Sequence, residues 1–83
     1  MKLNLTDRAV KDLHLLERSQ PKIVKRIIAK IQSLSDSPTE GKPLVGPLKG
    51  KWSLRVADYR IIYQFNKTSI LILTINHRKE VYR

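Results

Sequence analysis

Apolar residues recur with two different periods along this chain, and the changes of period divide it into elements. Residues 2–5 alternate between apolar and polar, which predicts a short first strand. Thr6 is a suitable N-cap, and Asp7 suits the first turn of a helix that we expect to reach about residue 18. Pro21 suits the first turn of a second helix, where a proline costs no hydrogen bond. The expected apolar faces consist of Ala9, Val10, Leu13 and Leu16 in the first helix and of Ile23, Val24, Ile27, Ile28, Ile31 and Leu34 in the second.

The second half of the chain predicts strands after an irregular connection. Ser37 and Pro38 end the second helix, and residues 36–50 carry three prolines and three glycines. Leu44, Val45 and Leu48 indicate that this connection is ordered in part. Strand-like runs follow at about 51–56, 59–65 and 70–75, with a turn over 66–69 between the last two. The order predicts an α+β fold in which a helical hairpin packs on a mostly antiparallel four-stranded sheet that includes the N-terminal strand.

A tight turn at Ala57 and Asp58 would fix the pairing of the first two of these runs. Side chains alternate along a strand, so the pairing sorts the hairpin into two faces that a slip by one residue would scramble. The face expected to receive the helices holds Trp52, Leu54, Val56, Tyr59, Ile61, Tyr63 and Phe65. The opposite face holds Lys51, Ser53, Arg55, Arg60, Ile62 and Gln64.

This register sets Arg55 directly opposite Arg60, which is unfavourable for two like charges in a sheet. Both side chains can extend into solvent, or pair with Asp58, Glu80 or the chain terminus. A phosphate fits the pair better, because guanidinium groups bind phosphate oxygens through two hydrogen bonds. The hairpin therefore predicts an anion site between the two arginines.

Charge and composition narrow the class of protein. Seventeen basic and seven acidic residues give a net charge of +10, and residues 42–83 contribute nine of the basic residues but only Asp58 and Glu80 of the acidic ones. So uneven a positive charge suits nucleic acid or an acidic protein partner. The absence of cysteine and the presence of only two histidines predict no metal site and no cofactor. With 83 residues, no signal peptide and no long apolar run, we expect one domain over 1–83 that is soluble, cytoplasmic and independent of membranes.

Two sequence blocks resemble the RelE/ParE superfamily of bacterial and archaeal toxins. They are "LKG…W.LRVADYRIIYQ" and, about a dozen residues later, "NHRKEVYR". The resemblance implies the toxin of a type II toxin–antitoxin system with a RelE-like, microbial-ribonuclease-like fold. RelE-type members are ribosome-dependent endoribonucleases (mRNA interferases) that cleave messenger RNA in the ribosomal A site, whereas ParE-type members poison DNA gyrase. It also implies a cognate RelB-like antitoxin, with operator DNA bound only by the toxin–antitoxin complex.

For the RelE reading, the resemblance also assigns roles to residues. It makes Lys51 the general base, Arg60 the group that stabilises the scissile phosphate, Arg78 the general acid, and Tyr82 the residue that stacks on the nucleotide or orients its 2′-hydroxyl. A second lysine of the family falls on Ser53, and relatives often carry glycine in place of Ala57. The expected RNA and phosphate contacts are Lys49, Arg55, His77, Lys79 and Arg83.

The chemistry is consistent with these side chains. The 2′-hydroxyl of RNA can attack the adjacent phosphate, so a protein needs only to move protons and to hold the negative charge that develops. No carboxylate is expected on the basic face, and a lysine serves as base only where neighbouring cations favour its neutral form. His77 is the other candidate base. We expect a RelE-type ribonuclease first, a ParE-type gyrase inhibitor second, and a catalytically inactive binding or repressor module third.

Overall fold

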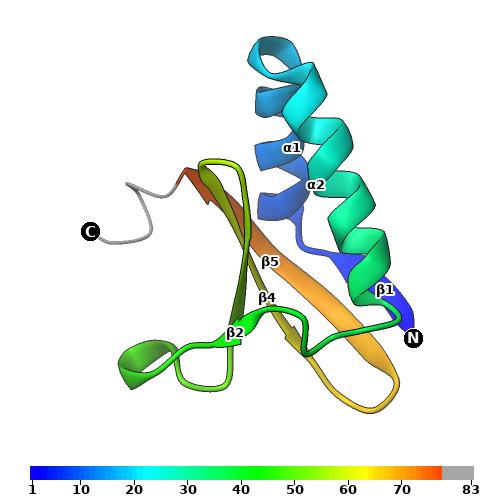
Figure 1. The fold of residues 1–83 in the computed structure, drawn as a ribbon, viewed down its shortest axis with the longest axis vertical. Coiled ribbons are helices and arrows are strands. Elements are labelled where there is room, and N and C mark those ends of the chain that lie inside the picture. The colour runs from blue at the N-terminus through cyan, green and yellow to red at the C-terminus, as the bar shows by residue number, and fades with distance from the viewer. Residues whose placement is uncertain (78–83) are drawn as a thin grey trace.

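The computed structural model describes residues 1–77. Two helices, α1 (Asp7–Ser19) and α2 (Pro21–Leu34), lie together on one face of a five-stranded sheet (Figure 1). The strands are β1 (Lys2–Leu5), β2 (Lys42–Pro43), β3 (Trp52–Val56), β4 (Tyr59–Phe65) and β5 (Ser69–His77), and the short 3-10 helix η1 spans Gly46–Leu48. The α+β architecture predicted from the sequence is confirmed. Neither helix is long and apolar enough to span a membrane.

The sheet has the order β1-β5-β4-β3-β2, in which β1 is parallel to β5 and all other neighbours are antiparallel. The expected number of four strands is wrong, because Lys42 and Pro43 in the connection pair with Ser53 and Trp52 of β3. A strand of two residues is too short to show alternation. The segment that carries β2 and η1 lies away from the two helices in Figure 1.

Both helices begin as the sequence predicts. Thr6 Oγ1 accepts a hydrogen bond from the backbone N–H of Ala9 at 3.1 Å and donates to the carbonyl oxygen of Leu73 at 2.6 Å. This cap therefore also joins α1 to β5. The expected apolar faces are too wide at two positions, because Val10 is 42% and Ile28 is 41% exposed. Each lies one residue further round its helix than a fully buried neighbour, Ala9 or Ile27.

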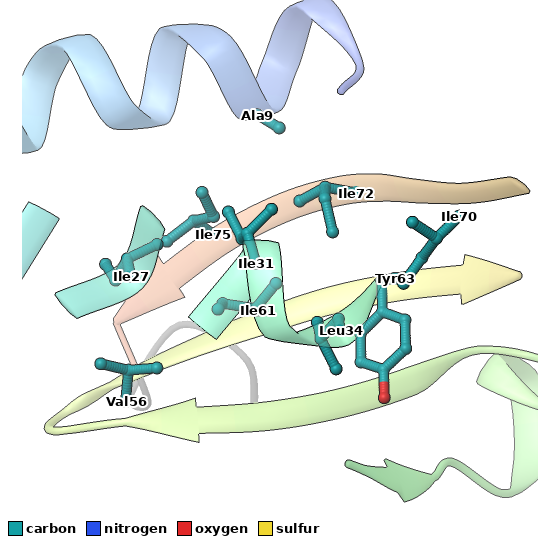
Figure 2. Close-up of a cluster of buried hydrophobic side chains, with 10 residues drawn as sticks. All are labelled: Ala9, Ile27, Ile31, Leu34, Val56, Ile61, Tyr63, Ile70, Ile72 and Ile75. Atoms are coloured by element: carbon teal, nitrogen blue, oxygen red, sulfur yellow. The ribbon is translucent and has the colours of Figure 1, made fainter. Parts of the chain in front are cut away.

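The core lies between the helices and the facing side of the sheet (Figure 2). Ala9 is fully buried, and its small side chain lets α1 approach β5 closely. Strand β5 is irregular opposite Ile62 and Tyr63, so it contributes Ile70, Ile72 and then Ile75, three residues later, to the core. The buried cluster consists of Ala9, Ile27, Ile31, Leu34, Val56, Ile61, Tyr63, Ile70, Ile72 and Ile75.

Candidate nucleic-acid interface

The two arginines of the hairpin lie opposite each other, as predicted. Arg55 pairs with Arg60 in the β3–β4 register, and Arg60 pairs in turn with Asn76 of β5. The flanking pairs, Leu54 with Ile61 and Val56 with Tyr59, pack on the core. By the alternation of strands, both arginines therefore belong to the face of the sheet that carries no helix.

The turn between the two arginines has a strained backbone and forms a hydrogen bond with the Arg55 side chain. Ala57 adopts a φ of 54°, in the left-handed region that glycine occupies without cost. Arg55 Nε donates to the carbonyl oxygen of Ala57 at 2.9 Å. This bond fixes the exposed Arg55 side chain against the turn and uses only one of the N–H donors of its guanidinium group.

A pocket of about 380 Å³ lies between β2 and the arginines. Lys42 of β2 pairs with Ser53 of β3, and both line this pocket with Arg55 and Arg60. Ser53 is 5% exposed, and its hydroxyl has no hydrogen-bond partner in the described part of the chain. The pocket therefore combines three cationic side chains with a buried hydroxyl, which is suitable chemistry for a phosphate group. The lining residues are Glu40, Gly41, Lys42, Leu44, Ser53, Leu54, Arg55 and Arg60.

One carboxylate borders the pocket without cancelling its charge. Glu40 Oε2 lies 3.4 Å from the Nζ of Lys30 on α2. Both side chains are partly exposed, so this ion pair is weak. Glu40 nevertheless has Lys30 as its ion-pair partner. The three cations of the pocket lining therefore remain in excess.

A buried tyrosine anchors the loop that leads to Lys42. The Tyr63 hydroxyl donates to the carbonyl oxygen of Pro38 at 2.7 Å and accepts from the backbone N–H of Gly41 at 3.1 Å. A Cβ at Gly41 would lie 2.6 Å from the carbonyl oxygen of Ser53 and from the Tyr63 hydroxyl, so only glycine fits. Burial raises the pKa of Tyr63, so the phenol remains a hydrogen-bond donor. Tyr63 thus connects the core to the wall of the pocket.

The two predicted lysines, Lys49 and Lys51, are not part of the lining of this pocket. Lys49 is exposed just after η1. Lys51 precedes β3 and is half-buried, and its backbone carbonyl accepts from the N–H of Leu44 at 2.8 Å. Lys51 lies outside the β3–β4 ladder, which begins at Trp52 and Tyr63.

His77 belongs to the other face of the sheet. It pairs with Tyr59, and the two rings meet edge to face with centroids 5.3 Å apart. His77 also lines a pocket of about 290 Å³ with Arg8 and Asp12 of α1. Its β5 neighbour Asn76, not His77, is the residue that pairs with Arg60. The remaining predicted contacts Arg78, Lys79, Tyr82 and Arg83 lie outside the described residues.

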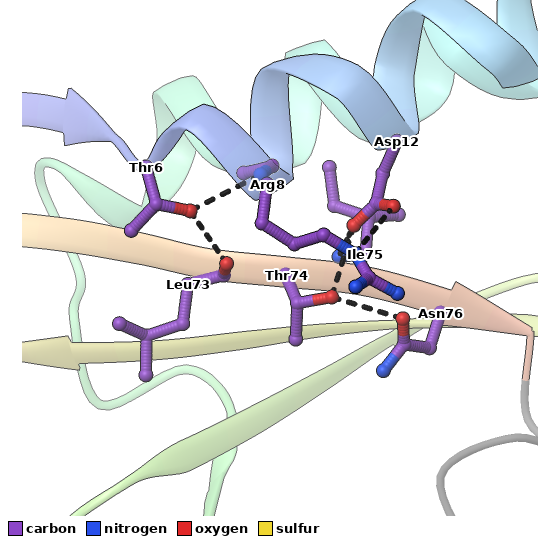
Figure 3. Close-up of polar contacts among 8 residues, drawn as sticks. Thr6, Arg8, Asp12, Leu73, Thr74, Ile75 and Asn76 are labelled. Atoms are coloured by element: carbon purple, nitrogen blue, oxygen red, sulfur yellow. Dashed lines mark hydrogen bonds and ion pairs between the residues drawn. The ribbon is translucent and has the colours of Figure 1, made fainter.

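Asp12 holds the last part of β5, the strand that carries Asn76 and His77 (Figure 3). Strand β1 ends at Leu5, so it does not reach the last part of β5. There Asp12 Oδ2 accepts from the backbone N–H of Ile75 at 3.0 Å and from Thr74 Oγ1 at 2.9 Å, while Arg8 Nε contacts Oδ1 at 3.2 Å. Asp12 therefore replaces a strand partner, and its oxygens are used structurally. Within residues 1–77, no group of three or more potential metal-ligating side chains is present.

Comparison with known proteins identifies the family of this chain. Residues 3–82 match the family described as "ParE toxin of type II toxin-antitoxin system, parDE". The chain belongs to this toxin family. The resemblance to the RelE/ParE superfamily, which rested on two sequence blocks, is thereby confirmed over nearly the whole chain.

Two named toxins are similar to this chain over most of its length. Toxin RelG of Mycobacterium tuberculosis is 34% identical over 98% of this chain and 94% of its own. Toxin YoeB of a Synechocystis species is 28% identical over 89% of this chain and 92% of its own.

Solved structures have the same fold. The RelBE2 toxin–antitoxin complex of Mycobacterium tuberculosis contains a chain that is 32% identical to this toxin, with a TM-score of 0.79 over 93% of this chain and 90% of that one. A YoeB/ParE toxin from Agrobacterium tumefaciens is 25% identical, with a TM-score of 0.80 over 93% of this chain and 98% of its own.

Proposed function

We propose that this toxin is a ribosome-dependent endoribonuclease that cleaves messenger RNA in the A site. The observation that carries the proposal is the pocket whose lining includes Arg55, Arg60, Lys42 and the buried Ser53. The 34% identity to RelG over nearly the full length supports the same branch of the superfamily. A ribosomal substrate also implies action in the cytoplasm.

The reaction needs a bound phosphate, a base and an acid. Arg60 holds the non-bridging oxygens of the scissile phosphate, and Arg55 and Lys42 add positive charge as the phosphorane forms. Ser53 stands where the family has a second lysine, so the stabilising charge comes from these three cations. Lys51 removes the proton of the attacking 2′-hydroxyl. Arg78 protonates the leaving 5′-oxygen, and Tyr82 orients the nucleotide.

Dependence on the ribosome follows from what surrounds the pocket. In the described chain, its lining holds no histidine, and its one carboxylate, Glu40, lies beside Lys30. A site with so few groups for acid–base catalysis depends strongly on the positioning of its substrate. The ribosome supplies that positioning by holding the codon in the A site. Free messenger RNA is then a poor substrate.

Ribosome profiling after brief induction tests the proposal. We expect ribosomes to accumulate at messenger ends cut within the A-site codon. Arg60→Ala should remove these ends, whereas Arg18→Ala, a matched loss of charge at the exposed end of α1, should retain them. Intact messengers with arrested replication would reject the proposal.

We also propose that a cognate antitoxin covers this surface. The solved RelBE2 structure is a toxin–antitoxin complex, and it contains a relative 32% identical to this chain. A second basic groove, of about 410 Å³, runs from Arg26 and Lys30 of α2 to Arg55 and Ala57. An acidic or amphipathic antitoxin segment along this groove would reach Arg55 and close the pocket. Only the complex would bind operator DNA.

Gyrase inhibition is the second candidate function. The name of the matching family and the serine at position 53 favour it. Supercoiling by purified gyrase, with and without the toxin, distinguishes the two activities. A catalytically inactive binding module is the third candidate, and it would leave both messenger RNA and supercoiling unaffected.

A further inference from the structure

Another pocket, of about 420 Å³, lies further along the helix-free face. Its floor is one row across three strands, because Asn4 of β1 pairs with Leu71 of β5, which pairs with Gln64 of β4. Gln64 follows Arg60 by four residues on β4, so both point to the same face. The lining residues are Asn4, Gly50, Gln64, Phe65, Asn66, Ser69 and Leu71.

The chemistry of this pocket differs from that of the phosphate pocket. None of its lining residues is charged, and the exposed amides of Asn4 and Gln64 provide both hydrogen-bond donors and acceptors. Leu71 and Phe65 add apolar surface. Neutral amides beside apolar side chains suit the edge and face of a nucleobase rather than a phosphate.

The third amide of the pocket is held in place by the β4–β5 turn. Asn66 Oδ1 accepts from the backbone N–H groups of Thr68 and Ser69, both at 2.9 Å, and from both of their hydroxyls at 3.2 Å. These bonds fix the orientation of the Asn66 side chain and leave its NH₂ group as the remaining donor. The pocket is thus organised without a ligand.

A glycine also lines the pocket. Gly50 has a φ of +95°, and a Cβ built on it would meet no atom within 4 Å. The positive φ favours glycine at this position, and the space beside its Cα is open to a planar group.

We propose that this pocket binds an unpaired purine base of the same RNA strand whose phosphate is held by Arg55 and Arg60. The proposal rests on the proposed function. Four residues of strand place Gln64 roughly 13 Å from Arg60 at about 3.3 Å per residue, which is the scale of a dinucleotide. Asparagine and glutamine side chains pair with the N6 and N7 atoms of adenine, so adenine is the favoured base.

The test measures binding of short single-stranded RNA by fluorescence anisotropy at fixed salt. The probes are a uracil hexanucleotide and the same RNA with adenine at each position in turn. We expect adenine at one position to strengthen binding about tenfold. In Gln64→Ala that preference should disappear, so that the adenine-containing RNAs and the uracil RNA bind alike. Gln32→Ala, a matched change at an exposed position of α2, should retain the preference.

The outcomes separate this inference from the proposed function. Equal binding of all the RNAs, or a preference that survives in Gln64→Ala with the melting temperature unchanged, overturns the base pocket alone. Failure of the wild-type toxin to bind any of the RNAs overturns the phosphate site as well. Loss of affinity for every RNA in Gln64→Ala also contradicts base recognition, because Gln64 would then support RNA binding irrespective of the base.

Discussion

The hydroxyl of Tyr63 bridges the loop before Lys42, donating to Pro38 O at 2.7 Å and accepting from Gly41 N at 3.1 Å. Tyr63 is fully buried and packs in the core cluster, whereas Lys42 and Ser53 line the phosphate pocket. The geometry of the candidate site is therefore coupled to the stability of the core.

Tyr63→Phe should destabilise the toxin and loosen the pocket. The change removes both hydrogen bonds and leaves the Pro38 and Gly41 backbone groups without these partners, at a cost of about 1–3 kcal/mol. Urea unfolding measures the loss. Tyr59→Phe is the matched control. Within residues 1–77, the Tyr59 hydroxyl does not bridge a loop as the Tyr63 hydroxyl does. Equal stability of the two variants would contradict the role of the bridge.

The same phenol should make stability fall at alkaline pH. Burial raises the pKa of Tyr63 above its usual value of about 10, so the folded state holds this proton more tightly than the unfolded state does. The contribution is fully present below the unfolded pKa and is lost as pH rises through the folded pKa. Lysines also titrate there, so the informative quantity is the difference between wild type and Tyr63→Phe. That difference should shrink above about pH 10; if it stays constant, the ionisation of Tyr63 is not coupled to folding.

Ala57→Gly should stabilise the hairpin that sets the two arginines opposite each other. Relief of the left-handed conformation is worth about 1–2 kcal/mol, and the greater freedom of the unfolded chain costs about 0.4–1 kcal/mol. Ala29→Gly, at an exposed position of α2, should instead destabilise by about 1 kcal/mol. Thermal unfolding of both variants gives the signs, and a loss of stability in Ala57→Gly would mean that the turn is not strained.

Lys42→Ala should weaken RNA binding without changing the fold. Lys42 is an exposed residue of β2 and contributes one of the three cations in the pocket lining. Removal of one phosphate contact should lower the slope of binding against salt by about 0.7 for single-stranded RNA. Lys67→Ala, an equal change of charge in the β4–β5 turn, is the control. Indistinguishable slopes for the two variants would exclude Lys42 from the interface.

The register of the β3–β4 hairpin could be predicted, because only one register puts its apolar side chains on one face of the sheet and most of its polar side chains on the other. The pairs from Trp52 with Tyr63 to Val56 with Tyr59 are all as expected. The parity of β5 could not be predicted, because the strand is apolar on both faces and irregular opposite Ile62 and Tyr63. Its last residue, His77, consequently lies with Tyr59 on the helix side rather than with Arg60.

The part of the site contributed by β2 had no signal in the sequence. Lys42 lies in a segment rich in proline and glycine, and it reaches Ser53 only through a pairing of two residues. Asp12 was also missed, since an acidic residue on a helix usually faces solvent. Its contact with β5 depends on β1 ending at Leu5, which only the three-dimensional structure reveals.

Cleavage in a purified translation system programmed with one messenger tests the central proposal most directly. Primer extension should show cuts within the A-site codon of ribosome-bound messenger, while free messenger stays intact. Arg60→Ala should slow cleavage by at least about 100-fold, the effect of removing one preorganised donor, and Arg18→Ala should cleave like wild type. Cleavage by Arg60→Ala at the wild-type rate, or intact ribosome-bound messenger together with blocked gyrase supercoiling, would contradict it.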